Sequence, residues 1–296
     1  MKTINKFERY LIDNGIQYKG AGKYRQMADK FLNWCRTSNL KVASLKRSQI
    51  TDYLQLCREQ GNKETTIRRK ENVLQHYYRF LGTKTNPATT WIQQKKEHTL
   101  PPRALEKQEL MNMYLSLHPH SPVGYRDRCI IGLIVFQGLL RSELWELRIS
   151  DIDFQGEVLI QGQLRTNSRK LKLEPVQLMH LYDYFHKYRN EFLCTKHNKE
   201  TDRFFLSKGV GEGLNNVATA LLKNIKRNFP QIIDFRHIRT SVITHWEKQD
   251  GIIEAMQKAG HRYISSTQRY QTNKYEELQE QLKNMHPLER MNISNI

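Results

Sequence analysis

Four short segments of this chain place charged or hydrogen-bonding side chains directly beside an apolar helical pattern. AGHRYISSTQRY contains His261 after a glycine and Tyr270 nine positions further on, RHIRTSVITHW contains Arg239, and GLLRSELWEL contains Arg141. The segment QLRTNSRKLKL supplies four basic side chains, Arg165, Arg169, Lys170 and Lys172. A single histidine or tyrosine is more often a packing residue, but the four segments together indicate a site for an anionic partner.

The charge of the whole chain also indicates an anionic partner. The 296 residues include 48 Lys and Arg against 30 Asp and Glu, which leaves a formal charge of +18. Such a surplus costs self-repulsion unless an anionic partner neutralises it, and nucleic acid is the leading partner. A basic surface without a specific partner is the alternative that charge alone leaves open.

The N-terminal part has the apolar periodicity of a small helical bundle. Apolar residues recur at i, i+3, i+4 and i+7 and predict helices over residues 24–35, 50–57 and 67–81. The last of these carries Arg68, Arg69 and Lys70 near its start. The following stretch of Gly, Pro, Thr and Lys reads as a linker, so we expect two domains, residues 1–98 and 99–296.

The second part is expected to be mainly helical with one small sheet. Residues 156–162 and 169–175 predict a two-stranded hairpin, and residues 203–207 a further short strand. The predicted helices cover residues 104–117, 126–136, 141–147, 215–228, 237–248, 251–259 and 274–285. The fold class is therefore mainly α in both domains.

The cysteines and the absence of long apolar segments indicate the cellular compartment. The four cysteines, Cys35, Cys57, Cys129 and Cys194, lie far apart among apolar neighbours, which favours buried free thiols in a reducing compartment. No window approaches the roughly 20 apolar residues that span a bilayer, and the N-terminus lacks the apolar core of a signal peptide. We expect a cytoplasmic, nucleoid-associated protein with no membrane contact.

The four segments carry a resemblance to a known family. PPRALEKQEL, YRDRCIIGLIVFQGLLRSELWELRISDID, RHIRTSVITHW and AGHRYISSTQRY occur in the order, and close to the spacing, of the tyrosine recombinases or phage-type integrases. The chain looks similar to divergent integrases of mobile elements. The resemblance implies a SAM-like, helical core-binding domain at the N-terminus, followed by a catalytic domain.

The resemblance also implies the reaction. A tyrosine hydroxyl attacks a DNA phosphodiester, forms a 3'-phosphotyrosyl bond and releases a 5'-hydroxyl, with no cofactor, metal or ATP. A free phenol has a pKa of about 10 and must be activated, while the phosphoryl oxygens must be held in the transition state. Arginine suits the second task because its planar fork binds two oxygens at once. A lysine or histidine can protonate the departing oxygen.

The family's motifs assign roles to individual residues. Tyr270 falls on the nucleophile, His261 on the histidine of the Gly-His step, and Arg239 on the second arginine. For Arg239, a surface contact to a phosphate is the alternative. We expect further DNA contacts from Arg165, Arg169, Lys172, His237, Arg68, Arg69 and Lys70.

Three positions depart from the family pattern. An ungapped match puts Leu140 under the first arginine, so Arg141 lies one place late and is either catalytic or a surface arginine. Arg236 stands where the family has a histidine, with His237 beside it, and either is expected to substitute. The hairpin lysine aligns with Gln163. The general acid is therefore expected to be Lys170, Lys172 or a neighbouring group on the RTNSRK loop. Lys170 is the first choice, and a DNA-backbone contact is its alternative.

Three functions follow from this pattern. The first is a site-specific recombinase or integrase acting on double-stranded DNA as a DNA-induced homotetramer, with possible accessory DNA-bending proteins. The second is a catalytically impaired, architectural DNA-binding relative, which the three departures motivate. The third is a relaxing enzyme of the type IB topoisomerase kind. A C-terminal helix with Tyr275, Leu278 and Leu282 on one face is expected to pack on a neighbouring protomer or on its own domain.

Overall fold

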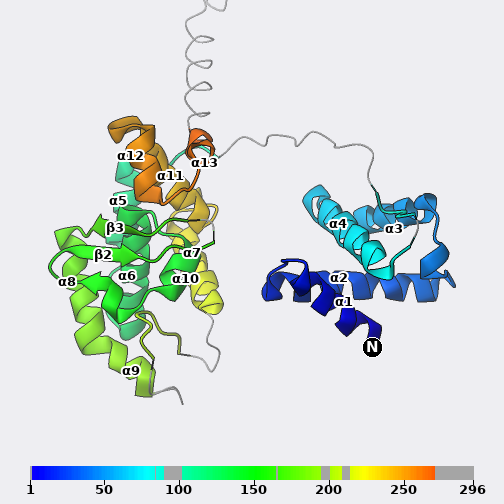
Figure 1. The fold of residues 1–296 in the computed structure, drawn as a ribbon. Coiled ribbons are helices and arrows are strands. Elements are labelled where there is room, and N and C mark those ends of the chain that lie inside the picture. Colours follow the sequence, from blue (N-terminus) through cyan, green and yellow to red (C-terminus); the bar gives the residue numbers. More distant parts are fainter. Residues whose placement is uncertain are drawn as a thin grey trace, which may run out of the picture. The chain divides into compact units, whose positions relative to one another are not determined.

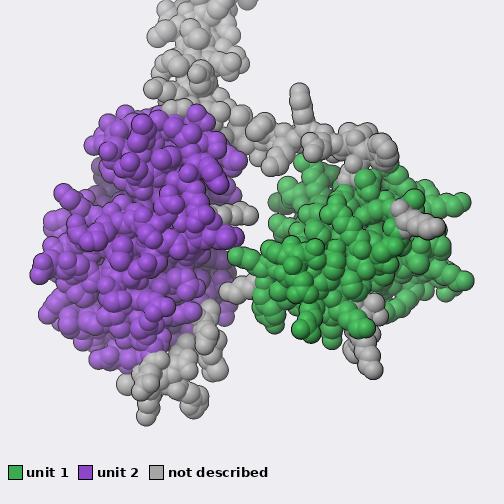
Figure 2. Space-filling view, viewed as in Figure 1, with its two compact units in different colours: residues 1–97 green, residues 98–296 purple. Residues whose placement is uncertain are grey.

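The chain forms two compact units, residues 1–97 and residues 98–296 (Figure 1, Figure 2). A computed structural model describes residues 2–83, 85–89, 102–164, 166–194, 201–208 and 214–270. The predicted helix 274–285 and Arg165 lie outside these described residues. Among the described residues, none of the helices combines the length and the apolar character that crossing a membrane would require.

Unit 1 is a bundle of amphipathic helices. Its helices are α1 (Lys2–Asp13), α2 (Tyr18–Thr37), α3 (Arg47–Glu59) and α4 (Glu64–Leu81), with a short 3-10 turn at Val42–Ser44. Phe31 of α2 meets Tyr53 of α3 edge to face, with ring centroids 5.1 Å apart. Phe7 of α1 meets Tyr77 of α4 in the same way at 5.0 Å. The apolar periodicity predicted α2, α3 and α4, whereas α1 was not predicted.

Unit 2 is built around helix α6 (Pro122–Gln137). The other helices are α5 (Lys107–Ser116), α7 (Arg141–Glu146), α10 (Asn215–Asn228), α11 (Phe235–Asp250), α12 (Ile252–Ala259) and α13 (Ile264–Gln268). Figure 1 shows α6 inside this unit, and α5, α11 and the further helix α8 (Pro175–Asp183) contact it. Nearly all of its central residues are buried, as a helix that is apolar all round should be.

The sheet contains one strand, β1, that the sequence did not predict. Strands β1 (Ile152–Asp153), β2 (Glu157–Ile160) and β3 (Arg169–Lys172) pair antiparallel in the order β1-β2-β3. The predicted hairpin corresponds to β2 and β3. The strand expected at residues 203–207 is wrong: only an isolated bridge joins Arg203 to Arg148. Phe204, Phe205 and Leu206 are all buried, so this segment fills the core as irregular chain.

A helical segment between the sheet and α10 escaped the sequence analysis. It consists of α8 (Pro175–Asp183), a π-helical turn at Tyr184–Tyr188, and α9 (Arg189–Cys194). Tyr184 and Phe192 are fully buried and anchor it to the core of unit 2. Cys35, Cys57 and Cys129 are buried free thiols as expected, and nothing is described for the Cys194 side chain.

Candidate active site

A buried carboxylate, Glu143, joins the elements that carry the predicted site residues. Its side chain is 0% exposed and accepts two hydrogen bonds from the Arg169 guanidinium, at 2.7 and 3.0 Å. Its Oε2 lies 3.7 Å from Nη1 of Arg239 and accepts the backbone N–H of Leu140 at 2.8 Å. Glu143 therefore connects α7, β3 and α11.

Arg239 is held by acceptors of the protein itself. It is 4% exposed. Its Nη1 donates to the carbonyl oxygen of Gly138, and its Nη2 donates to the carbonyl oxygen of Ala259 at 2.7 Å. Burial lowers the pKa of Arg239 to about 10, against the opposing effect of Glu143, so the guanidinium remains charged at neutral pH.

Gly138 makes the contact to Arg239 possible. It ends α6 in the left-handed conformation, with φ 58°, where glycine is favoured. A Cβ at this position would lie 3.0 Å from the Trp246 ring. The glycine thus turns its carbonyl toward Arg239 while the chain passes close to the indole.

His261 is neutral and oriented by two contacts. Arg239 can only donate hydrogen bonds, so its Nη2, 3.4 Å from Nε2 of His261, faces an unprotonated nitrogen. The ring proton therefore sits on Nδ1, which donates to the hydroxyl oxygen of the fully buried Thr267 at 2.9 Å. Burial, followed by the charges of Arg239 and Arg169, lowers the pKa of His261 to about 4.

Tyr270 lies directly beside this histidine. The two rings are stacked, with centroids 6.0 Å apart and an interplanar angle of 5°. The Tyr270 backbone N–H donates to the carbonyl oxygen of Thr267 at 2.9 Å, just after α13 ends. Thr267 therefore holds the histidine through its hydroxyl and the tyrosine through its backbone. The sequence analysis did not single out this threonine.

The β2–β3 connection is attached to the same place. Thr166 forms a bridge with His261, and the Asn167 N–H donates to the Gly260 carbonyl oxygen at 2.8 Å. Gln163, which aligns with the family's hairpin lysine, accepts a hydrogen bond from the Ser142 hydroxyl at 2.9 Å. An amide cannot serve as an acid, so Gln163 contributes a contact and no proton.

The lysines and the arginine of β3 point to opposite faces of the strand. Side chains alternate along a strand, and the burial pattern of β3 follows this rule. Arg169 is buried against Glu143, whereas Lys170 and Lys172 are exposed. Lys170 thus does not join Arg239 and His261. Arg169, expected to contact DNA, instead has its guanidinium inside the protein, because Glu143 and the Lys258 carbonyl oxygen (2.7 Å) bind it.

Two further residues that were expected to contact DNA, His237 and Lys70, instead contact groups of the protein. His237 is 5% exposed, receives the Ile233 N–H on Nδ1 at 3.3 Å, and contacts the Arg103 carbonyl oxygen through Nε2 at 2.8 Å. In unit 1, Lys70 donates to the Cys57 sulfur at 2.9 Å. Arg69 is exposed at the start of α4, and Arg68 is half-buried.

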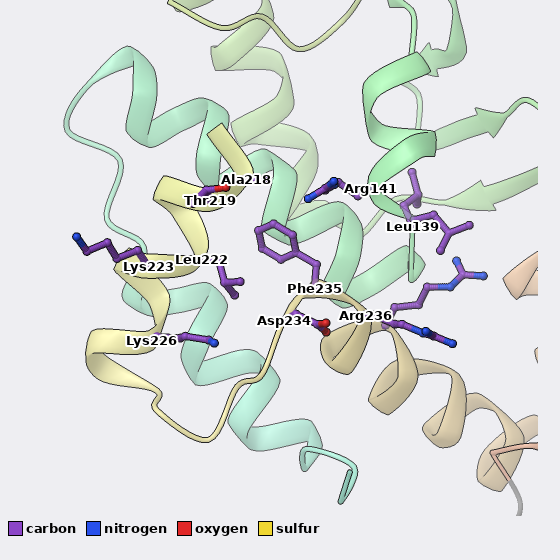
Figure 3. Close-up of a pocket in the computed structure, with 12 residues that line it drawn as sticks. Leu139, Arg141, Ala218, Thr219, Leu222, Lys223, Lys226, Asp234, Phe235 and Arg236 are labelled. Atoms are coloured by element: carbon purple, nitrogen blue, oxygen red, sulfur yellow. The ribbon is translucent and has the colours of Figure 1, made fainter. Parts of the chain in front are cut away.

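A cavity of about 550 Å³ opens next to Arg239, between α7, α10 and the start of α11 (Figure 3). Its apolar walls come from Leu139, Leu140, Ala218, Leu222 and Phe235. Four exposed cations also line it: Arg141, Lys223, Lys226 and Arg236. Figure 3 shows Arg141 and Arg236 entering from different elements, with the Phe235 ring in the cavity. Such a basic cavity suits a phosphate group.

Glu143 was the main omission of the sequence analysis. It was part of the quoted segment GLLRSELWEL, but no role was assigned to it. A glutamate three residues into a helix is typical of a residue that caps the helix start. Its contacts to Arg169 and Arg239 come from segments 26 residues and 96 residues away, and no local pattern indicates them.

Comparison with known proteins gives two family matches. Residues 103–277 match the model described as Phage integrase family, and residues 4–84 match the Phage integrase, N-terminal SAM-like domain. The first match alone spans more than half of the chain.

Similar proteins agree with these matches. Tyrosine recombinase XerC of Oceanobacillus iheyensis is 26% identical over 302 residues, which cover 96% of this chain and 98% of the relative. Tyrosine recombinase XerD of Listeria innocua is 22% identical over 303 residues, with the same coverage.

Solved structures show the same fold. The Tn1549 transposon integrase in complex with transposon right end DNA superposes with a TM-score of 0.67 at 14% identity, over 95% of this chain and 98% of that one. XerH site-specific recombinase bound to palindromic difH substrate gives 0.66 at 18% identity, over 89% and 79% of the two chains. Both units of this chain thus have the fold expected from its sequence, a helical SAM-like domain and a mainly helical domain with a small sheet.

Proposed function

The chain belongs to the phage integrase family, the tyrosine recombinases that break and rejoin DNA at specific sites, and on that premise we propose that Tyr270 is its nucleophile. The observation that carries this proposal is the cluster of Arg239, His261 and Tyr270. Three elements, α11, the end of α12 and α13, bring the three side chains together around Thr267 and Glu143.

The chemistry follows from the groups in this cluster. The Tyr270 hydroxyl oxygen attacks the phosphorus, the bond from phosphorus to the 5'-oxygen breaks, and a 3'-phosphotyrosyl bond forms. The departing 5'-oxygen takes up a proton from solvent and leaves as a hydroxyl. The phenolic proton has to leave. His261, whose ring is unprotonated at neutral pH because its pKa is lowered to about 4, stacks on the phenol. Its Nε2 faces Arg239, so it becomes the base for the phenolic proton only once it gives up that contact. The charge of Arg239 stabilises the phosphoryl oxygens from the inner side of the site.

A trapping experiment tests this proposal. Duplexes that bind the Tyr270→Phe protein are first enriched from a random-sequence library. The enriched duplex is then nicked near the cleavage position, so that the released fragment diffuses away and the adduct accumulates. Wild-type protein should form a denaturation-resistant adduct. Tyr270→Phe should form none, whereas Tyr263→Phe, which removes the hydroxyl of a tyrosine that is 70% exposed, should behave like wild type.

The absence of an adduct on DNA that the protein binds would contradict catalysis. It would support the second candidate, an architectural DNA-binding protein. The observation that favours this second candidate is Leu140, an apolar side chain at the position where the family's first arginine is expected. The same trapping experiment therefore separates the two functions.

Double-stranded DNA is the proposed partner, and a DNA-induced homotetramer the proposed assembly. The formal charge of +18 supports DNA binding. In unit 1, the exposed Arg69 and the half-buried Arg68 are proposed to contact the DNA backbone. In unit 2, the exposed Lys170 and Lys172 are proposed to do the same. Affinity should fall steeply as salt rises, because bound phosphates release counterions. Sedimentation of the protein with and without the selected duplex tests the assembly, and a species that stays monomeric on DNA would contradict it.

A further inference from the structure

We infer that Thr267 is a positioning residue for strand transfer: its hydroxyl oxygen keeps the ring proton of His261 on Nδ1 and so leaves Nε2 to accept the phenolic proton of Tyr270. The inference rests on the proposed function and deepens it, because it names the group that decides which nitrogen of His261 acts. Thr267 lies in α13, three residues before the tyrosine, and its side chain is fully buried.

The first reason is that the backbone of His261 does not select a nitrogen. Its N–H donates to the Met256 carbonyl oxygen at 3.0 Å, and the residue forms a bridge with Thr166. These contacts place the residue, but only the ring nitrogen without a proton can accept one. Among the described residues, two side chains contact the ring: Thr267 at Nδ1 (2.9 Å) and Arg239 at Nε2 (3.4 Å).

The second reason is that the Arg239 contact cannot select the nitrogen during the reaction. Nε2 takes up the phenolic proton only after it has given up Arg239, because its single lone pair cannot accept from both groups. From that moment the contact at Nδ1 alone decides where the ring proton lies. The Thr267 hydroxyl oxygen accepts the Nδ1–H group, so Nε2 remains the basic nitrogen.

The third reason is that the Thr267 contact persists through the proton transfer. When the proton moves from the Tyr270 oxygen to Nε2, the ring becomes an imidazolium with a hydrogen on both nitrogens. Nδ1 still donates to the Thr267 hydroxyl in that state, so the ring does not have to turn. A neutral hydroxyl serves both charge states, whereas a carboxylate in its place would favour the charged ring before the reaction.

The fourth reason is that Thr267 also positions the tyrosine relative to this ring. Its carbonyl oxygen accepts the Tyr270 N–H at 2.9 Å, and the phenol and imidazole planes differ by 5°. The donor and the acceptor of the phenolic proton are thus both attached to one residue. Because Thr267 is 0% exposed, water does not compete for its hydroxyl.

The test uses variants that change only this hydroxyl. Thr267→Val replaces it by a methyl group of similar size and keeps the backbone contact to Tyr270, and Thr267→Ser keeps the hydroxyl. Thr244→Val is the matched control, because Thr244 is 1% exposed and its hydroxyl donates within α11, to the Thr240 carbonyl oxygen at 2.9 Å. Adduct formation is followed in single turnovers on saturating nicked duplex, and affinity is measured in the Tyr270→Phe background.

The rate and the affinity should respond differently. Thr267→Val should slow adduct formation by about 100-fold, at the lower end of what a positioned base contributes, and leave the affinity for the duplex unchanged. Thr267→Ser should restore most of the rate, because the serine hydroxyl also accepts the Nδ1–H group. Thr244→Val should behave like wild type. A disturbed fold would instead lower rate and affinity together.

A second measurement locates the ring proton and requires no DNA. The nitrogen chemical shifts of isotope-labelled histidine show which ring nitrogen is protonated, and the His261 signals are identified by their loss in His261→Asn. Arg239→Met removes the contact at Nε2, as the reaction does. In this background the proton should stay on Nδ1 when residue 267 is threonine or serine, and should move in part to Nε2 in Thr267→Val.

Several results would overturn the role of Thr267. One is a Thr267→Val protein that forms the adduct at the wild-type rate, and another is a Thr267→Ser protein that is as slow as Thr267→Val. A ring proton that stays entirely on Nδ1 without the hydroxyl is a third. If the wild type binds the duplex but forms no adduct, strand transfer is contradicted, while the position of the ring proton still decides whether Thr267 orients His261.

Discussion

Arg239 and Arg236 lie one helical turn apart on α11, yet their surroundings are opposite. Arg239 is 4% exposed, and its donors are taken by carbonyl oxygens, Glu143 and His261. Arg236 is exposed at the rim of the cavity. The same contrast separates Arg169, buried in its ion pair with Glu143, from Arg141. Residue type alone therefore says little about the role of an arginine here, because burial determines whether its donors serve the protein or a ligand.

The largest expected effect comes from removing the charge that the two buried arginines share. Glu143→Gln leaves Arg169 and Arg239 without their carboxylate, and a broken buried pair costs about 3–5 kcal/mol of unfolding free energy. Hydrogen exchange of the α11 amides in the full chain measures this loss. Arg236→Gln, on the same helix, should change protection by less than about 0.5 kcal/mol. Equal losses for the two variants would abolish the distinction between buried and rim arginines.

A smaller effect on stability is expected at Gly260, whose backbone lies against the buried Arg169 side chain. Gly260 ends α12 with φ 69°, and a Cβ there would lie 2.5 Å from Nη1 of Arg169. Gly260→Ala should cost the roughly 1–2 kcal/mol of a left-handed residue, and an additional amount for displacing the guanidinium. Gly82 is a matched control, since it has φ 66° and no atom within 4 Å of its Cβ position.

The change in melting temperature of the full chain measures the effects of Gly260→Ala and Gly82→Ala. Gly260→Ala should destabilise its unit more than Gly82→Ala destabilises unit 1. In an Arg169→Ala background, the further loss caused by Gly260→Ala should fall to that of Gly82→Ala. If the two single alanine variants lose the same free energy, the contact between Gly260 and Arg169 contributes nothing beyond backbone strain.

A pH-dependent effect is expected at His261. Its pKa is about 4 in the folded protein, against about 6.5 in an unfolded chain, so the unfolded state binds a proton first as the pH falls. The contribution of the neutral ring to stability is complete above pH 6.5 and is lost progressively down to about pH 4. Denaturation at several pH values should show that His261→Asn loses less stability over this interval than wild type. An identical pH dependence in both proteins would mean that the ring titrates normally.

The smallest effect is expected on the exposed face of β3. Lys170→Ala should change the rate of adduct formation by less than about threefold and lower the slope of log affinity against log salt by about one. Lys172→Ala serves as the comparison, because it lies on the same exposed face two residues further on. A much larger rate loss for Lys170→Ala than for Lys172→Ala would restore Lys170 as the general acid.

Much of the fold was predictable from local patterns. Apolar spacing located α2, α3 and α4 in unit 1 and most helices of unit 2, because these helices each bury one face. The β2–β3 hairpin was also found. Helix α1 was not predicted, the α8–α9 segment is interrupted by a π-helical turn that breaks the regular apolar spacing, and β1 is only two residues long. Residues 203–207 look like a strand but lie in the core as irregular chain.

The sequence by itself determined the family and the order of the motifs that contain Arg239, His261 and Tyr270. These signals are local, because each depends on residue types within a short segment. Only the tertiary structure decided which basic residues are free to meet a ligand. Arg169 and His237 look like surface cations in the sequence, but they lie inside the protein, while Arg141 and Arg236 line the cavity. That difference depends on contacts between distant segments, chiefly those of Glu143, which the sequence does not specify locally.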